Sequence, residues 1–351
     1  MLPAKQGGLG LLSAEGRAAP AFLSSWAAAA RDVAGALGLP TGERFRLAAT
    51  GAVHECEQAW LHYSSRGCER PCGTWEDWLA KATTKLQKAL HSEDKDKSHA
   101  RLLESATRED KADIRSAGGV GQSWAATQVQ VAPPLADPSW AVVTRRRLRV
   151  QWPAGRGDGT CKHRRANGTF CGAPLDARGT HALTCNCGGG VDRRHNRLRD
   201  VIAAWLKEQG HEAVDTEVQV PQWRRQRPNG TFEDARLDIT FRTAGVQLYA
   251  DVVVASPVSE DAERAARRAR TDGATAEAAE KEKRQRYPHP NLAPLAVETL
   301  GRLGAVSQAF ARRWATRDPL RRPAALASFY GGVAAALQQH NADMLQSSVA
   351  A

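Results

Sequence analysis

The hydrophobic pattern divides the chain into a helical first part and a mixed second part. Apolar residues recur at helical spacing along residues 19–37 and through much of 41–115, where Trp, Leu and Ala alternate at positions 75–86. Residues 91–111 are nearly all polar, which predicts an exposed helix or a loose linker. We therefore expect residues 1–150 to form a mainly α-helical region.

Beyond residue 193 the pattern changes between strand and helix periodicity. The predicted elements are a helix at 194–209, strands at 214–220, 236–241 and 247–254, a long charged helix at 259–286 with a break at Gly273, a strand at 295–299, and helices at 303–314 and 324–337. The residues after this last helix carry no comparable pattern, so we expect a loose tail. The order predicts an α/β fold with a central sheet flanked by helices.

Composition narrows the class of protein. The 351 residues carry 49 Lys and Arg against 38 Asp and Glu, for a net charge of +11, which favours an anionic partner such as nucleic acid. No apolar run approaches the ~20 residues of a membrane-spanning helix, so we expect no membrane partner. Seven cysteines, an odd and uneven set, argue against a secreted disulfide scaffold.

Four of the cysteines crowd into a Gly-rich segment, residues 156–192, that has too few large apolar residues for a core. Zinc prefers four thiolate and imidazole ligands, which the spacing supplies as Cys161, Cys171, His181 and Cys185. Cys187 and His163 are alternative ligands. The other interpretation is that the segment binds no metal and carries unconnected thiols. A full set of four protein ligands indicates a structural site. A second group around Cys56, Cys68 and Cys72 is better explained as idle thiols.

Two aspartates interrupt apolar strands. Asp238 and Asp251 are separated by twelve residues, as suits neighbouring antiparallel strands joined by a short turn. Buried carboxylates need a partner, and Mg²⁺ or Mn²⁺ would relieve the repulsion between two of them and activate water. Glu217 is a candidate third acid. The alternative is that both aspartates stand at strand ends and face water.

Basic residues surround this region. The sets that we take as candidate DNA contacts are Arg145, Arg146 and Arg147, and Arg194, His195 and Asn196. Trp152 and Trp223 stand near basic positions, where stacking on bases would assist. For His195 a catalytic, zinc-supporting or capping role is also open, and we favour a structural or DNA-contact role.

The order of these motifs resembles the C-terminal part of site-specific non-LTR retrotransposon polyproteins. The matching features over residues 160–315 are the Cys-Cys-His-Cys set, Arg194-His195-Asn196, Arg-Leu-Asp at 236–238, Ala-Asp-Val at 250–252, Glu280, Lys283 and Tyr287, and Pro-Leu-Ala-Val-Glu-Thr-Leu-Gly at 294–301. The resemblance implies a zinc element followed by a restriction-like endonuclease of the PD-(D/E)XK superfamily. A weaker likeness at residues 7–11 and around Trp26 is to the segment that follows such elements' reverse transcriptase.

The resemblance also implies roles for single residues. Asp238 and Asp251 would hold the catalytic Mg²⁺ or Mn²⁺, and Lys283 would be the catalytic lysine, displaced onto a helix. Leu237 replaces the signature proline, and Val253 stands where the usual pattern places the lysine. No reverse-transcriptase core is found in the sequence.

Together these observations predict four regions. They are a helical region at 1–150, a zinc element at 156–192, a restriction-like endonuclease domain at 193–320, and a C-terminal helix with a loose tail at 321–351. The expected function is metal-dependent nicking of DNA in the nucleus. DNA is the expected partner, element RNA and a reverse transcriptase on another chain are candidate partners, and the alternatives are an inactive zinc-containing nucleic-acid-binding remnant or a protein-binding scaffold.

Overall fold

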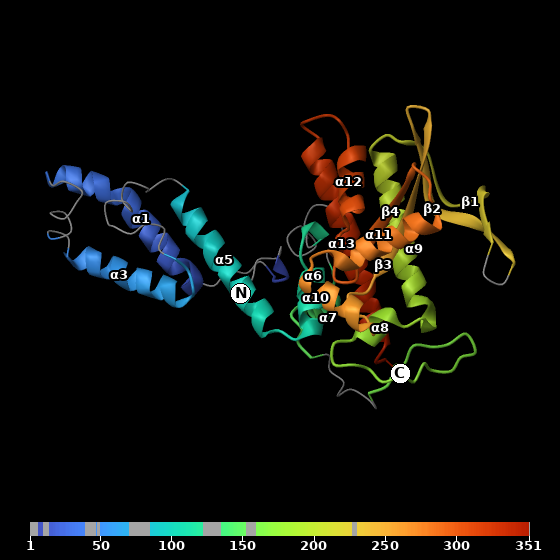
Figure 1. Ribbon diagram of the computed structural model, residues 1–351, viewed down its shortest axis with the longest axis horizontal. Coiled ribbons are helices and arrows are strands. Elements are labelled where there is room, and N and C mark those ends of the chain that lie inside the picture. The colour runs from blue at the N-terminus through green and yellow to red at the C-terminus, as the bar shows by residue number, and fades with distance from the viewer. Residues whose placement is uncertain are drawn as a thin grey trace. The chain divides into compact units, whose positions relative to one another are not determined.

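The computed structural model in Figure 1 describes residues 6–9, 14–38, 47, 50–69, 85–121, 135–151, 159–226 and 230–350. The chain forms two compact units. The N-terminal unit comprises residues 1–3 and 10–105, and the C-terminal unit comprises residues 4–9 and 106–351. None of the described helices is long and apolar enough to cross a membrane. The helix expected around residues 75–86 falls almost wholly outside the described residues, as do Cys72 and Trp152.

The N-terminal unit is helical, as the pattern predicts. Its main helices are α1 (Ala14–Ala36), α3 (Thr50–Ser65) and α5 (Leu86–Ser105), and α1 packs against both of the others. The Tyr63 hydroxyl reaches the Leu90 carbonyl oxygen at 2.9 Å, and Arg66 pairs with Asp94 through two contacts of 2.6 and 3.0 Å. The polar stretch at 91–111 is therefore helix, not linker, through most of its length.

The C-terminal unit contains all four strands. Its elements are α6 (Arg108–Ser116), α7 (Asp137–Arg147), α8 (Thr180–Thr184), the 3-10 turn η3 (Cys187–Gly189), α9 (Gly190–Glu208), β1 (Glu212–Gln226), β2 (Phe232–Thr243), β3 (Val246–Ala255), α10 (Ala262–Arg270), α11 (Ala274–Arg286), β4 (Leu292–Glu298), α12 (Ala305–Trp314) and α13 (Arg322–Ser347). The predicted break in the long charged helix is confirmed, because Gly273 adopts a φ of 76° between α10 and α11.

The sheet is mixed and runs in the order β1-β2-β3-β4. The first three strands are antiparallel and β4 is parallel to β3. A tight turn at Gly245, with a φ of 77°, joins β2 to β3 and sets the register in which Ile239 faces Ala250. One step further along the same ladder come Asp238 and Asp251, so the register places the two acids side by side.

Helices cover the sheet and build the main core. Figure 1 shows α9, α12 and α13 gathered beside the strands, and large side chains from these helices meet Phe241 of β2. Trp205 of α9 packs edge-on against Phe329 of α13, and its indole NH donates to the Ala325 carbonyl oxygen at 2.9 Å. α11 packs on β3 and β4. The fold is thus a mixed α/β arrangement with a four-stranded sheet and flanking helices.

The expectation of a loose tail is wrong. Helix α13 continues to Ser347, and its last turns are held by burial of Asn341, Ala342, Met344 and Leu345. Met344 and Leu345 pack with Ala182 and Leu183 of α8. Met344 and Leu345 are the only large apolar residues buried in this stretch, and amide and small side chains fill its other buried positions, so it shows no continuous hydrophobic stripe although it is packed.

Candidate functional site

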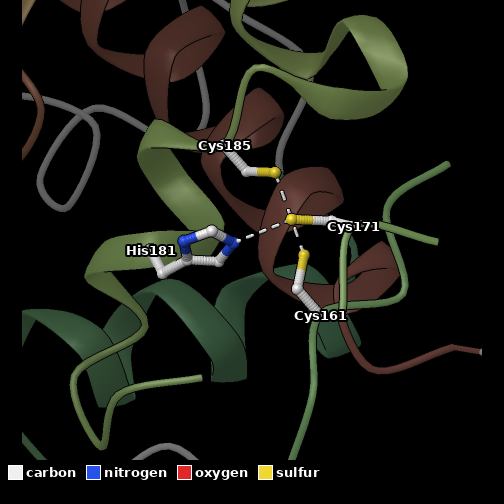
Figure 2. A group of neighbouring side chains, drawn as sticks. All are labelled: Cys161, Cys171, His181 and Cys185. Atoms are coloured by element: carbon white, nitrogen blue, oxygen red, sulfur yellow. Dashed lines mark hydrogen bonds between the residues drawn. The ribbon is translucent and has the colours of Figure 1, made fainter. Parts of the chain in front are cut away.

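The four residues of the Cys/His cluster, Cys161, Cys171, His181 and Cys185, lie together, as the spacing predicts. Their ligand atoms all lie within 4.8 Å of one another, and Figure 2 shows the three sulfur atoms and the Nε2 of His181 turned toward one point. The sulfur atoms of Cys161 and Cys185 are 3.9 Å apart, and Cys171 Sγ lies 3.5 Å from His181 Nε2. Sulfur atoms on one tetrahedral zinc ion lie about 3.8 Å apart, given Zn–S bonds of about 2.3 Å. The cluster could therefore bind a metal such as zinc.

Local sequence chemistry sets these positions. The Asp176 carboxylate accepts the backbone N–H groups of Thr180 and His181 at 3.0 and 2.7 Å, which fixes the start of the short helix that carries His181. Gly179 precedes that helix with a φ of 70°. The Cys161 N–H donates to the Ala173 carbonyl oxygen at 2.8 Å and so draws the first two ligand segments together.

The thiols differ in acidity. Hydrogen bonding from the Ala173 backbone lowers the pKa of Cys171 to about 6, and burial raises the pKa of Cys185 to about 12. Four close protein ligands leave no open position, which is typical of a structural metal site. Of the two alternative ligands, His163 is turned away, because its Nε2 contacts the Met344 carbonyl oxygen at 2.9 Å. The sulfur atom of Cys187 is not part of the group of four ligand atoms that lie within 4.8 Å of one another.

Asp238 and Asp251 form a buried acid pair across β2 and β3. Their side chains are 12% and 4% exposed, and the two carboxyl groups interact directly. Burial and the charge of Asp238 raise the pKa of Asp251 to about 7. Burial also acts on Asp238, but hydrogen bonds from His195 and from the Val252 N–H outweigh it and hold its pKa below the usual value. The Val252 N–H donates to Asp238 Oδ2 at 2.6 Å.

Two further groups reach the acid pair from different helices. Lys283 of α11 brings its Nζ to 2.6 Å from Asp251 Oδ2, and His195 of α9 brings its Nε2 to 3.1 Å from Asp238 Oδ2. The hydrogen bond with Asp238 raises the pKa of His195 although burial opposes it. Sequence reasoning found the lysine through the spacing of Glu280, Lys283 and Tyr287. It placed His195 among the DNA contacts. Its position on α9 between the buried residues Arg194 and Leu198 was the one sign in the sequence that His195 lies close to the sheet.

Helix α11 is held in place by buried carboxylates at each side. Glu298, at the end of β4, accepts the Ala276 N–H near the start of α11 at 3.1 Å. Glu280 accepts the Val306 N–H at the start of α12 at 3.1 Å, and burial raises the pKa of both acids. Gly304 is required at this contact, because a Cβ there would lie inside the van der Waals radius of Glu280. Glu280 therefore supports the helix that presents Lys283.

Glu217 lies on β1 opposite Asp238, because its neighbours Thr216 and Val218 pair with Ile239 and Leu237. It adopts a φ of 60° on β1, and its carboxylate is paired with the guanidinium groups of Arg199 and Arg236. These two arginines already neutralise the negative charge that Glu217 would otherwise offer to a metal ion. Its contacts thus argue against the role of third metal acid.

Half of the candidate DNA contacts are buried. Arg146 forms a two-contact ion pair with Asp113 at 2.7 and 3.2 Å, and Arg147 Nε donates to the Gly8 carbonyl oxygen at 2.9 Å. Arg194 donates to Asn341 Oδ1 at 2.9 Å and is 3% exposed. These three side chains serve packing within the C-terminal unit, so their assignment as DNA contacts is corrected. A helix places every third or fourth residue of a basic run inward, which the run alone does not reveal.

Arg145 and Asn196 remain exposed, and His195 is partly exposed beside the acid pair. No protein-family model matches this chain, and no curated protein matches it. The function is therefore inferred from the geometry of the site.

The acid pair also suits a divalent cation. Asp251 Oδ2 is buried, and its charge is faced by the Lys283 ammonium group, whose Nζ lies 2.6 Å away. An oxygen of this kind, beside a second carboxylate, is a ligand that Mg²⁺ and Mn²⁺ prefer. The residues present thus fit such an ion, with Asp238 and Asp251 as its protein ligands.

Proposed function

We propose that this protein is a divalent-metal-dependent DNA endonuclease. The observation that carries the proposal is the convergence of Asp238, Asp251 and Lys283, two buried acids on adjacent strands with a lysine 2.6 Å from one of them. Two buried carboxyl groups in direct contact repel each other, and a divalent cation between them would relieve that repulsion. Buried groups with perturbed acidity gather at sites of chemistry more often than elsewhere.

Each residue of the site has a role in phosphodiester hydrolysis. A bound Mg²⁺ or Mn²⁺ supplies Lewis acidity and a more acidic water. Asp238 and Asp251 are the residues that would hold that ion. Lys283 releases Asp251 and offers its ammonium to the charge that builds on the phosphate. His195 keeps Asp238 ionised and oriented, because its Nε2 lies 3.1 Å from Asp238 Oδ2.

The architecture supports the same proposal. A helix, three antiparallel strands, a helical connection and a parallel fourth strand follow one another from α9 to β4. This is the arrangement expected for a PD-(D/E)XK nuclease core, and the preceding Cys/His cluster completes the likeness to the zinc element and endonuclease of non-LTR retrotransposons. Within that proposal the protein nicks target DNA in the nucleus, and a reverse transcriptase on another chain uses the released 3′ end. The RNA of the element is a candidate further partner.

Exposed basic residues offer the binding surface. Arg145 at the end of α7 is an exposed cation, the neutral Asn196 on α9 is an exposed hydrogen-bonding group, and the net charge of +11 favours a polyanion. The zinc ion has a structural role in this proposal, because the Cys/His cluster offers four protein ligands and no free position.

A second candidate function is nucleic-acid binding without cleavage. It is favoured by Val253, which stands two residues after the second acid where the usual nuclease pattern has its lysine. In that case Lys283 would neutralise Asp251 permanently, at a site that no longer binds a metal.

The decisive test is nicking of supercoiled plasmid by the purified, zinc-loaded chain with Mg²⁺, with Mn²⁺ or without either metal. We expect metal-dependent conversion to open circles that Asp238→Ala and Asp251→Ala both abolish. Asp215→Ala is the matched control, because Asp215 is an exposed acid on β1. If folded, DNA-binding protein fails to nick in either metal, the binding function replaces the nuclease.

A further inference from the structure

A group of aromatic side chains lies close to the acid pair and has no part in the proposed cleavage. Trp223 on β1 has its ring centroid 4.7 Å from that of Tyr249 and 4.5 Å from that of His289. Tyr287, which follows α11, lies 6.2 Å away with its ring tilted by 32°. Trp223 is only partly buried although its neighbours hold it from two sides. A large, fixed and partly exposed ring is a surface on which another flat group can stack.

The rings border a cavity of about 300 Å³. Its walls include Trp223, Tyr287 and His289, and two arginines, Arg224 and Arg286, stand at its rim. This volume lies at the lower end of the range for pockets that hold small organic ligands. We call this cavity, with its three rings, its two arginines and the Tyr249 ring that packs on Trp223, the aromatic pocket.

The two arginines give the aromatic pocket its charge. Arg286 is exposed and makes no ion pair with any residue that the structure describes. Arg224 is also exposed, and it stacks over Phe232 at 4.8 Å and lies 3.5 Å from Asp234. A flat aromatic wall with cations at its rim matches a nucleotide, which joins a flat base to an anionic phosphate.

The aromatic pocket shares its elements with the acid pair. Tyr249 lies two residues before Asp251 on β3, so both side chains point to one face of the sheet. Tyr287 follows Lys283 by four residues, which is about one turn of α11. The acid pair and the aromatic pocket are thus linked both by β3 and by the end of α11. A DNA strand bound at the acid pair would therefore pass next to the aromatic pocket.

The backbone of β1 is irregular at Trp223. The register between β1 and β2 shifts between Val220 and Arg225, so Trp223 stands in a bulged stretch of an edge strand. Bulges redirect a side chain away from regular alternation and are frequent beside active sites. This stretch turns Trp223 toward Tyr249 across the sheet.

We propose that the aromatic pocket binds an unpaired nucleobase next to the phosphate that is cleaved, so that the preferred substrate is DNA with a locally single-stranded or extruded nucleotide. This inference rests on the proposed endonuclease function for its position in the reaction. Stacking on Trp223 requires a base that is free of its neighbours in the duplex. Arg286 and Arg224 contact the flanking phosphates, and Lys283 keeps the role at the cleaved phosphate that it has in the proposed reaction.

The test uses the full chain without added Mg²⁺ or Mn²⁺, where we expect no cleavage, and single-stranded oligonucleotides that carry one 2-aminopurine. We expect binding to quench its fluorescence, because the probe stacks on Trp223. Trp223→Ala should remove the quenching and weaken binding about tenfold, the size of one base–aromatic stack. Trp223→Phe should keep most of both, and Phe22→Ala, an exposed aromatic of the N-terminal unit, should change neither.

A second variant keeps the test valid if Trp223→Ala folds poorly. Arg286→Ala removes an exposed side chain, and it should weaken single-strand binding and reduce the slope of affinity against salt by about one ion. Unchanged quenching and affinity in both variants would overturn the aromatic pocket as a base site, as would equal weakening of fully paired duplex by Trp223→Ala.

Cleavage separates this inference from the function on which it rests. If the wild-type chain nicks paired and gapped duplexes equally, and Trp223→Ala does the same, the endonuclease stands and the base pocket fails. If Trp223-dependent quenching is seen without nicking in any metal, the base pocket stands as a binding site and the endonuclease fails.

Discussion

The Cys/His cluster and the acid pair bring ionisable groups together in opposite ways. In the cluster, loops and a short helix converge until four soft ligands lie within 4.8 Å of one another. In the acid pair, two regular strands hold two hard ligands, and helices α9 and α11 add one side chain each. The first arrangement offers four ligands around one point, whereas the second keeps two repelling carboxyl groups in contact beside one lysine.

This difference separates what stabilises the fold from what reacts. A closed set of ligands gains its free energy when the metal binds, and the segment that carries it has too few apolar residues to stay folded alone. An open set costs stability, because two buried carboxylates repel each other, and the sheet and helices around it must supply the difference. Substitutions should therefore act on folding at the cluster and on chemistry at the acid pair.

The largest effect is expected from loss of a cluster ligand. Cys185→Ser should lower bound zinc from one ion per chain to none and destabilise residues 159–192 by on the order of 5 kcal/mol or more, because structural zinc contributes directly to folding. Native mass spectrometry would count the metal, and limited proteolysis would report unfolding of the segment. A fully folded, metal-free variant would contradict the structural role.

Arg146→Ala tests whether a second closed arrangement behaves like the cluster. Removing one partner of the buried pair with Asp113 should destabilise the C-terminal unit by about 3–5 kcal/mol, because Asp113 is left buried and unpaired. Urea unfolding followed by circular dichroism would measure the loss. Arg145→Ala, next to it but exposed, is the control and should change stability by less than about 0.5 kcal/mol.

The open site should show the opposite division of effects. Asp251→Asn should reduce nicking at least about a hundredfold yet change the free energy of unfolding by no more than about 1 kcal/mol, because it removes one of two repelling charges and keeps the side-chain volume. Parallel nicking rates and thermal unfolding would measure both. If the variant loses stability as severely as Cys185→Ser, the two sites do not differ as described.

The smallest effect is expected at Cys187, a thiol near the cluster but outside the group of four. Cys187→Ser should leave one zinc ion per chain and change stability by less than about 1 kcal/mol. Zinc analysis beside the thermal unfolding curve would settle this. Loss of the ion would show that Cys187 replaces one of the four ligands.

Local patterns predicted most of the elements of the C-terminal unit. The alternation around Asp238 and Asp251 and the short turn at Gly245 predict adjacent strands, and the register confirms that neighbouring placement. Gly273 predicted the break between α10 and α11. Such features depend on residues close in sequence, so their physical cause can be read there.

Features that depend on distant residues were missed. The burial of Arg194 depends on Asn341, a residue 147 positions later, and the pairing of Glu217 with Arg199 and Arg236 depends on the packing of α9 against β1. The aromatic pocket joins residues from β1, β3 and the end of α11. Only the position of Tyr249, two residues before an acid on the same strand, hinted at it.

Helix α13 has a consequence for the order in which the protein is made. The Ser348 carbonyl oxygen, directly after α13, accepts the N–H of Lys162 in the Cys/His segment at 2.9 Å. Asn341 of α13 accepts a hydrogen bond from Arg194 of α9. During synthesis on a ribosome, both segments emerge well over a hundred residues before their partners. Until residues 341–348 leave the exit tunnel, the nascent C-terminal unit therefore keeps its Cys/His segment and α9 incompletely covered. The C-terminal end of α13 therefore determines how long these segments stay accessible to chaperones and to premature aggregation.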